Sequence, residues 1–170
     1  MKIIVAACKN MGIGFQNKLP WHLKSDLVKF KHLTIGNGNN AVIMGSNTWR
    51  SLPKQPLPNR FNCILSSSLH VDNNNSKTFN NVDNLLEFTN SNKFDDVWVI
   101  GGEKIYNLFL EKDLINSIYL TKIYENYICD TYFNYPTSFN IIETSRMMAS
   151  KNILYNYILL EKNQKHKYHY

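Results

Sequence analysis

The stretch Val97-Trp-Val-Ile-Gly-Gly-Glu-Lys-Ile-Tyr106 joins an apolar, strand-like run to a helical pattern through two adjacent glycines. A strand that is apolar nearly throughout is typical of a sheet covered on both faces. Glycines at the end of such a strand let the backbone approach a ligand closely, and the N-terminus of the following helix favours phosphate. A tight turn without a ligand explains the same glycines equally well. The stretch alone therefore predicts a strand–helix unit rather than a function.

Similar runs recur along the chain, and their order predicts an α/β fold. Apolar runs of strand length cover residues 2–8, 41–44, 62–66, 96–100, 117–124, 139–143 and 153–160, and helical patterns cover 25–34, 82–89 and 103–110. Strands that alternate with helices indicate a mostly parallel sheet flanked by helices. The last three strand-like runs follow one another without a helical pattern, which predicts an antiparallel edge in the C-terminal third.

Composition limits the chain to one domain and excludes several classes of protein. The 170 residues are 44% hydrophobic and 19% charged, which excludes a disordered or collagen-like chain. This length can bury a core without disulfides or metals as staples. The longest apolar run, Ile3 to Cys8, is too short to span a membrane or to form a secretory leader, so we expect no membrane partner. Cys8, Cys63 and Cys129 lack paired spacing, which predicts reduced thiols and a cytoplasmic protein.

The net charge of +6 raises the question of a nucleic-acid partner. Lys162, Lys165 and Lys167 crowd the last nine residues, and without them the net charge falls to about +3. The other lysines are scattered, and no zinc-finger or RNP signature is present. A terminal tail in solvent explains the charge more simply, so we expect no nucleic-acid partner. A basic nucleotide- or nucleic-acid-binding module remains the alternative from another functional class.

Asp26 is an unusual residue in its helical pattern. It precedes Phe30 by four positions and Leu33 by seven, which places a carboxylate on the apolar face of the helix. Burial there would raise the pKa of the carboxyl group unless a cation pairs with it. Such a carboxylate can anchor a cationic or amidine-like ligand through paired hydrogen bonds. An aspartate in the first turn also stabilises the helix dipole and caps free N–H groups, so both interpretations stay open.

Small polar residues follow two further strands. Met44-Gly-Ser-Asn-Thr-Trp49 repeats the strand–glycine–helix pattern, and Ser67 and Ser68 follow the run 62–66. Ligands of open α/β sheets bind outside the carboxyl ends of the strands, so these groups together favour a dinucleotide site. Serine and threonine are also ordinary N-caps of helices, which explains each turn separately.

Arg60, one of three arginines, follows the stiff segment Pro56-Leu-Pro58. A guanidinium held in this way suits bidentate capture of a carboxylate, although a surface salt bridge is the simpler role. The histidines and cysteines have no metal-ligand spacing, and no Ser–His–Asp arrangement is present, so we predict no metal site.

In their order and spacing these motifs resemble the dihydrofolate reductase family. The motifs are Leu19-Pro-Trp21 followed by Asp26, Met44-Gly-Ser-Asn-Thr-Trp49, Pro58-Asn-Arg60, Ile64-Leu-Ser-Ser67, Val99-Ile-Gly-Gly102 and Asp130-Thr-Tyr-Phe133. The resemblance covers residues 1–161, and it leaves 162–170 as a basic tail or the start of a linker. It implies the dihydrofolate reductase fold, with an eight-stranded, mostly parallel sheet, an antiparallel C-terminal edge and flanking helices.

The resemblance also implies the reaction, which is reduction of 7,8-dihydrofolate to 5,6,7,8-tetrahydrofolate by NADPH. Tetrahydrofolate supports one-carbon metabolism and thymidylate synthesis. Antifolate-type molecules would bind the same site. The protein would be a monomer unless it is fused to or paired with a thymidylate synthase.

Site residues follow from the same resemblance. The catalytic set would be Asp26, Trp21 and Thr121, with Asp26 bonded to Thr121 and accepting hydrogen bonds from the pterin. The substrate pocket would be lined by Val5, Ala6, Leu27, Phe30, Leu52, Leu57 and Ile100, with Arg60 holding the glutamate carboxylate. The nicotinamide would be bordered by Ala7, Ile13, Gly14, Asn17 and Leu19, and the segment 10–21 would act as a mobile lid. The rest of the cofactor would contact Gly45, Ser46, Asn47, Thr48, Leu65, Ser66, Ser67, Ser68, Gly101, Gly102, Glu103, Lys104, Ile105 and Tyr106. The Gly101–Gly102 peptide is expected to be cis.

The chain departs from the family pattern at the cofactor's 2′-phosphate. The family usually has Arg or Lys after the glycine at position 45, and here Ser46 and Asn47 follow. The resemblance therefore implies the reaction more directly than a preference for NADPH over NADH. Lys29 would lie near the outer pocket, where it attracts polyglutamylated folate or points to water. A reductase of a ribosylaminopyrimidine intermediate in riboflavin synthesis is the related-fold alternative, which Leu19-Pro-Trp21 and Asp26 disfavour.

Overall fold

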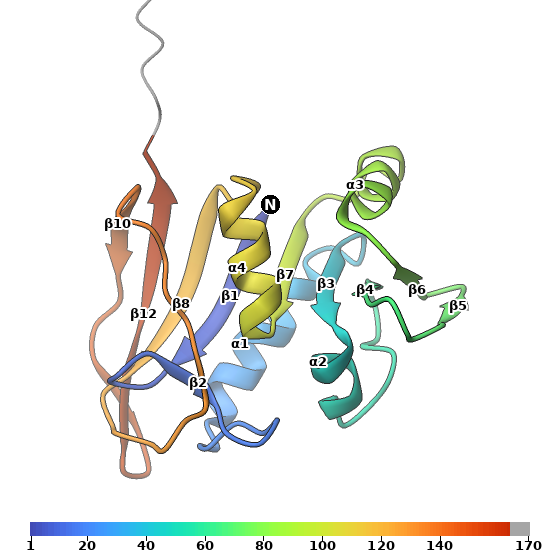
Figure 1. The fold of residues 1–170 in the computed structure, drawn as a ribbon. Coiled ribbons are helices and arrows are strands. Elements are labelled where there is room, and N and C mark those ends of the chain that lie inside the picture. The colour runs from blue at the N-terminus through green and yellow to red at the C-terminus, as the bar shows by residue number, and fades with distance from the viewer. Residues whose placement is uncertain (164–170) are drawn as a thin grey trace, which may run out of the picture.

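The protein is built around one large sheet, as a computed structural model of residues 1–163 shows (Figure 1). The strand order is β10-β12-β8-β1-β7-β3-β4-β6-β5, and β11 pairs with β12. The strands are β1 (Lys2–Ala7), β3 (Ala41–Gly45), β4 (Phe61–Leu65), β5 (Asp72–Asn73), β6 (Ser76–Phe79), β7 (Val97–Gly101), β8 (Ser117–Ile123), β10 (Phe139–Thr144), β11 (Met148–Ser150) and β12 (Ile153–Lys162). The helices are α1 (Lys24–Ile35), α2 (Ser46–Ser51), α3 (Val82–Ser91) and α4 (Glu103–Glu111). A separate small sheet pairs β2 (Gly12–Gly14) with β9 (Thr131–Tyr132).

The pairing confirms the predicted sheet. Strands β8, β1, β7, β3, β4 and β6 run parallel to one another, whereas β12 and β10 are antiparallel at the C-terminal edge and β5 is antiparallel to β6 at the other edge. The short strands β5 and β11 are additions to the predicted eight. The predicted helices are present, with boundaries that shift by one or two residues.

Helices cover both faces of the sheet, and β1 shows why its sequence is apolar throughout. Ile3 and Val5 pack toward α3 and α4, in a cluster that includes Leu85 and Phe109. The intervening Ile4 faces the opposite side, in a second cluster formed with residues of α1 and α2. In Figure 1, α4 lies in front of the central strands and α1 behind them. The active-site candidates lie mainly on the α1 side and at the ends of the central strands.

The C-terminal strand extends beyond its predicted end. Strand β12 continues to Lys162, which pairs with Phe139 of β10 and forms an ion pair with Asp113. Lys162 therefore belongs to the sheet rather than to the tail that we expected to begin there. Lys165 and Lys167 lie outside the described residues. Over residues 1–163, no helix is both long enough and apolar enough to cross a membrane.

Candidate active site

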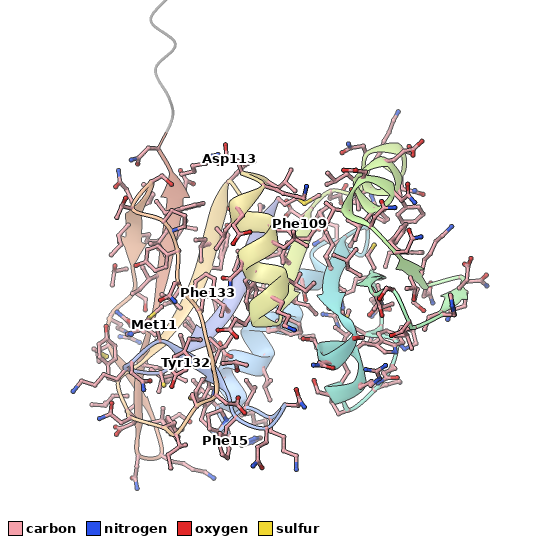
Figure 2. The ribbon with its side chains drawn as sticks, in the orientation of Figure 1. Met11, Phe15, Phe109, Asp113, Tyr132 and Phe133 are labelled. Carbon is pink, nitrogen blue, oxygen red and sulfur yellow. The ribbon has the colours of Figure 1, made fainter. Side chains whose placement is uncertain are left out.

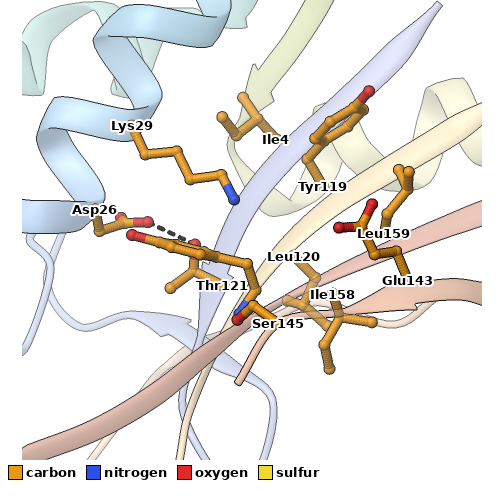
Figure 3. A pocket seen from close by; sticks show the side chains of 11 residues that line it. Ile4, Asp26, Lys29, Tyr119, Leu120, Thr121, Glu143, Ser145, Ile158 and Leu159 are labelled. Atoms are coloured by element: carbon orange, nitrogen blue, oxygen red, sulfur yellow. Dashed lines mark hydrogen bonds between the residues drawn. The ribbon is translucent and has the colours of Figure 1, made fainter. Parts of the chain in front are cut away.

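Asp26 is held by a partner from the centre of the sheet. The hydroxyl of Thr121 on β8 donates a 2.5 Å hydrogen bond to Oδ1 of Asp26 (Figure 3). The N-cap of α1 is Leu23, and no side chain caps this helix end, so Asp26 has no capping role. Burial raises the pKa of the Asp26 carboxyl group, while the hydrogen bond from Thr121 and the charge of Lys29 oppose that rise. The result is a fixed carboxylate beside the sheet.

An apolar cluster on the α1 side brings several predicted substrate residues together. Four of them share one cluster with Ile4 and Trp49, namely Phe30, Leu52, Leu57 and Ile100. Ala6 packs in the neighbouring cluster that contains Trp21. Leu27 is largely exposed on α1. The Val5 side chain packs in the cluster on the α4 side, so the structure does not bring it to Asp26.

Arg60 is buried rather than part of a surface ion pair. Its Nη1 donates a 2.5 Å hydrogen bond to Oγ1 of Thr34, and its Nε donates a 3.0 Å bond to the carbonyl of Pro58. The guanidinium carbon lies 5.8 Å from the centroid of the Phe30 ring. Burial lowers the pKa of the guanidinium group. A guanidinium has five N–H donors, so these two bonds leave donors for a carboxylate ligand beside the apolar cluster.

Two glycine turns lie side by side at the ends of the central strands. Met44 of β3 pairs with Gly101 of β7, so the turns into α2 and α4 are neighbours. The N-caps of these helices are Gly45 and Gly102, and neither helix end has a side-chain cap. Uncapped N–H groups at neighbouring helix starts form a ready site for a pyrophosphate.

The geometry of the turns leaves no room for larger residues. The Gly101–Gly102 peptide is cis, as predicted, and Gly101 has a φ of 119°, which favours glycine. A Cβ at Gly101 would lie 3.2 Å from the hydroxyl oxygen of Tyr106. A Cβ at Gly45 would lie 3.1 Å from Ile105. A side chain at either position would therefore press against a side chain of α4.

Some predicted cofactor residues also have structural roles. Oε1 of Glu103 accepts a 3.0 Å hydrogen bond from the backbone N–H of Tyr132, which ties α4 to β9. Oγ of Ser66 accepts hydrogen bonds from the N–H groups of the two residues that complete its turn, Ser68 and Leu69. The buried hydroxyl of Tyr106 donates a 2.9 Å bond to the carbonyl of Ile4. Lys104 is exposed on α4.

Ser66 and Ser67 line an open groove of about 620 Å³ between the end of β4 and α3. Lys77 and His70 line the same groove. The Lys77 ammonium lies 6.0 Å and 5.8 Å from the ring centroids of Phe79 and Phe88. This part of the molecule therefore offers the ammonium group of Lys77, whereas the motif after Gly45 has no charged side chain before Arg50.

The predicted lid, residues 10–21, is fastened to the segment around β9. The N–H of Gln16 donates a 2.8 Å hydrogen bond to the Asp130 carboxylate, and the N–H of Phe133 donates a 2.9 Å bond to the carbonyl of Met11. Figure 2 shows Met11 and Phe133 close together on this side of the molecule. The lid carries four of the residues predicted to border the nicotinamide: Ile13, Gly14, Asn17 and Leu19.

Trp21 is the last residue of the lid and is buried. Its ring centroid lies 5.4 Å from that of Tyr127. Its indole Nε1 is buried, and no atom of the described residues accepts a hydrogen bond from it. Buried polar atoms are rarely left without a partner in folded proteins. An unpaired N–H next to the lid therefore fits a site that takes a polar ligand.

A model of the family described as dihydrofolate reductase matches residues 1–163. This chain belongs to the dihydrofolate reductase family. It is 31% identical to the dihydrofolate reductase of Drosophila melanogaster, over 95% of this chain and 97% of that protein. It is 34% identical to the dihydrofolate reductase of Gallus gallus, over 76% of this chain and 75% of that protein. The match confirms the predicted family, fold class and class of enzyme.

Bifunctional proteins are also among the relatives. The chain is 34% identical to the bifunctional dihydrofolate reductase-thymidylate synthase of Paramecium tetraurelia, over 99% of this chain. It spans only 36% of the length of that protein. Dihydrofolate reductase sequences thus occur both as proteins of this size and as parts of longer chains.

Two side chains of this site, Asp130 and Tyr157, have no predicted role in the sequence analysis. A third, Lys29, has only the two open alternatives given above. Asp130 lies in a quoted motif, but only the structure shows that its carboxylate holds the lid. Tyr157 is opposite Thr121 in the β12–β8 register. No local sequence signal identifies Tyr157, because its place depends on which strand β12 joins.

Proposed function

We propose that this chain reduces 7,8-dihydrofolate to 5,6,7,8-tetrahydrofolate and uses NADPH as the hydride donor. The observation that carries the proposal is the Asp26 carboxylate, fixed by Thr121 at the α1 face of the sheet. The apolar cluster and Arg60 on that face, and the two glycine turns at the strand ends, support the same reaction. Each of them matches a separate part of a folate and a dinucleotide.

Asp26 would orient the pterin ring and promote its protonation. A carboxylate accepts several hydrogen bonds, so the bond from Thr121 leaves acceptors for the 2-amino group and a ring nitrogen of the pterin. The negative charge of Asp26 would raise the proton affinity of the bound ring. The proton itself would arrive through water. Arg60 would hold the glutamate carboxylate at the other end of the substrate.

The turns at Gly45 and Gly102 would hold the pyrophosphate, and residues of the lid would cover the nicotinamide. The uncapped helix starts fit the pyrophosphate, and the unpaired indole N–H of Trp21 fits a polar ligand beside the lid. NADPH supplies the hydride when it is bound. The chain's own residues then align the substrate and exclude water, which explains why the reaction needs no side-chain nucleophile.

A preference for NADPH over NADH would rest on cations other than the usual residue after Gly45. Ser46 and Asn47 are uncharged, but Ser66 and Ser67 share their groove with Lys77 and His70. We therefore propose that Lys77 contributes the positive charge for the 2′-phosphate. A phosphate bound by hydroxyl groups and an ammonium is a common arrangement.

The wider setting follows from the same proposal. Tetrahydrofolate made by this chain would support one-carbon metabolism and thymidylate synthesis in the cytoplasm. Antifolate-type molecules would compete for the site around Asp26. The protein would act as a monomer, unless a thymidylate synthase is fused to it or paired with it as in the bifunctional relatives.

The deciding experiment follows the nicotinamide absorbance of NADPH in the presence of dihydrofolate. We expect oxidation that saturates with dihydrofolate and stops without it. Oxidation with a ribosylaminopyrimidine substrate alone would point to the riboflavin alternative. No oxidation, together with salt-sensitive binding of oligonucleotides, would point to the basic binding module.

A further inference from the structure

A small cavity lies next to Asp26, between α1 and the C-terminal edge of the sheet. Its volume is about 120 Å³, and its polar lining consists of Asp26, Lys29, Tyr119, Thr121, Glu143, Ser145 and Tyr157. Of the predicted substrate residues other than Asp26 and Thr121, none lines it. The cavity therefore brings an ammonium group close to the proposed catalytic carboxylate, and Ile4 of the apolar cluster lines it as well.

The position of Lys29 in this cavity is defined by contacts from two elements. Lys29 follows Asp26 by three positions on α1, so the two side chains leave the helix on the same face. The ammonium nitrogen of Lys29 lies 3.3 Å from the centroid of the Tyr157 ring. A cation over the face of an aromatic ring is attracted to it, and more strongly when it is shielded from water. Figure 3 shows the Lys29 side chain extended into the cavity rather than away from the protein.

Strand pairing links this contact to the hydrogen bond of Asp26. Tyr157 of β12 lies opposite Thr121 of β8 in the sheet. One strand pair thus supplies both the hydroxyl that binds Asp26 and the ring that holds Lys29. The ammonium group is fixed within the same rigid frame as the carboxylate.

Burial lowers the pKa of Lys29 below its ordinary value, and the neighbouring carboxylates oppose that loss of positive charge. These carboxylates are those of Asp26 and of Glu143 on β10. Burial raises the pKa of Tyr157 to about 12, with Tyr155 and Asp26 adding to the rise, so this phenol is neutral at physiological pH. Tyr119 on β8 also lines the cavity. From the α4 side, Asp26 adds to the rise in the pKa of the buried Tyr106, which therefore stays protonated.

We propose that Lys29 is a positioning residue that keeps the Asp26 carboxylate ionised and sets the pH at which dihydrofolate reduction declines. The inference rests on the proposed function. A fixed positive charge lowers the proton affinity of Asp26 and of a pterin bound to it, whichever of the two holds the proton. In the free protein, Lys29 therefore favours the ionised form of Asp26, which accepts hydrogen bonds from the N–H groups of the pterin. In the substrate complex, Lys29 lowers the pH above which the pair of Asp26 and pterin loses its proton.

The test compares the pH dependence of turnover in Lys29→Met, Lys29→Arg and Lys31→Met, at saturating dihydrofolate and NADPH. Lys31 is exposed on the same helix and is the matched control. In Lys29→Met we expect the alkaline decline to move to higher pH. At pH values above the wild-type midpoint, turnover of Lys29→Met should exceed that of wild type about threefold. The reason is that a nearby charge shifts the pH of half-titration of a carboxyl group by a fraction of a pH unit or more. Lys29→Arg and Lys31→Met should keep the wild-type midpoint.

A second measurement does not depend on turnover. Carbon-13 NMR of labelled aspartates reports the pH at which the Asp26 carboxyl group is half-titrated in the free protein. The signal of Asp26 is identified by its absence in the Asp26→Asn variant. We expect Lys29→Met to raise that midpoint and Glu143→Gln, which removes a competing carboxylate, to lower it. If Lys29→Met fails to fold, Lys29→Gln takes its place. Unchanged midpoints in both measurements would overturn the inference, whereas a wild-type protein that does not reduce dihydrofolate would overturn only the proposed function.

Discussion

Asp26 and Thr121 are 95 residues apart in sequence and are joined by a 2.5 Å hydrogen bond between the hydroxyl and Oδ1 of the carboxylate. The bond connects the first turn of α1 to β8, a strand that comes more than 80 residues later in the chain. It supports the ionised form of Asp26, while burial opposes that form. The balance between the two effects gives the carboxylate its proposed role and its pH dependence.

Replacement of Asp26 by asparagine keeps the size of the side chain and removes its charge. We expect NADPH to bind as in wild type, because the glycine turns are not altered. Turnover at neutral pH should fall by about a hundredfold or more, since the bound pterin loses the group that promotes its protonation. Steady-state rates and NADPH fluorescence titration measure the two effects. Unchanged turnover would rule out the role given to Asp26.

The same substitution should stabilise the fold at neutral pH. The pKa of Asp26 is raised from its ordinary value of 3.8, so the folded protein binds this proton more tightly than the unfolded chain does. The contribution of Asp26 to stability is then greatest below pH 3.8, and it declines as the pH rises through the folded-state pKa. Urea unfolding should show Asp26→Asn more stable than wild type at neutral pH, with the difference reduced in acid. A neutral-pH loss of stability would contradict the raised pKa.

Arg60→Ala should separate folate from a shorter ligand. The loss of a charge-assisted contact with the glutamate carboxylate should cost about 1.5–3 kcal/mol of binding free energy. Pteroate has no glutamate and should bind with little change. Because Arg60 also donates to Thr34, thermal unfolding serves as the control for a general loss of structure. Equal losses for both ligands would argue against the carboxylate contact.

Gly101→Ala should weaken both the fold and NADPH binding. The φ of 119° is unfavourable for alanine, and the new Cβ would lie 3.2 Å from the Tyr106 hydroxyl oxygen. We expect a loss of about 1–3 kcal/mol in stability. Gly38→Ala is the matched control, because Gly38 also has a positive φ, but a Cβ there would meet no atom of the described residues within 4 Å. Gly38→Ala should lose stability and retain its affinity for NADPH. An equal loss of NADPH affinity in both variants would contradict the proposed binding of the pyrophosphate at the Gly101–Gly102 turn.

Lys77→Met tests the proposed 2′-phosphate contact. The KM for NADPH should rise about tenfold, as expected for one lost charge-assisted hydrogen bond, while the KM for NADH stays unchanged. Lys112→Met, on an exposed site after α4, controls for the loss of one positive charge. Equal effects on the two cofactors would exclude Lys77 from recognition of the phosphate.

Sequence patterns identify the elements whose signals are local. The apolar runs predict the central strands within one or two residues, because both faces of these strands are buried. Short strands such as β6, Ser76–Phe79, escape detection, since their pairing with β4 rather than their own residues fixes them. Arg60 and the glycine turns stand out because proline and glycine limit the backbone in recognisable ways.

The surroundings of Asp26 could not be predicted in the same way. Its place on the apolar face of α1 follows from helical spacing, whereas its bond to Thr121 was inferred only through the family resemblance. For Lys29, the resemblance implies only a place near the outer pocket, with attraction of polyglutamylated folate and exposure to water as the alternatives. Its contact with Tyr157 requires the order β12-β8-β1, which no local pattern specifies.

The position of β12 next to β8 affects when the site can exist. During synthesis, Asp26 leaves the ribosome early, and Tyr157 follows only when β12 is made. Until β12 docks, the cavity beside Asp26 lacks one wall, and the Lys29 ammonium has no ring to hold it. A nascent chain, or a product cleaved before β12, would thus carry the proposed catalytic carboxylate without its electrostatic setting. Synthesis of β12 therefore determines when this site is complete.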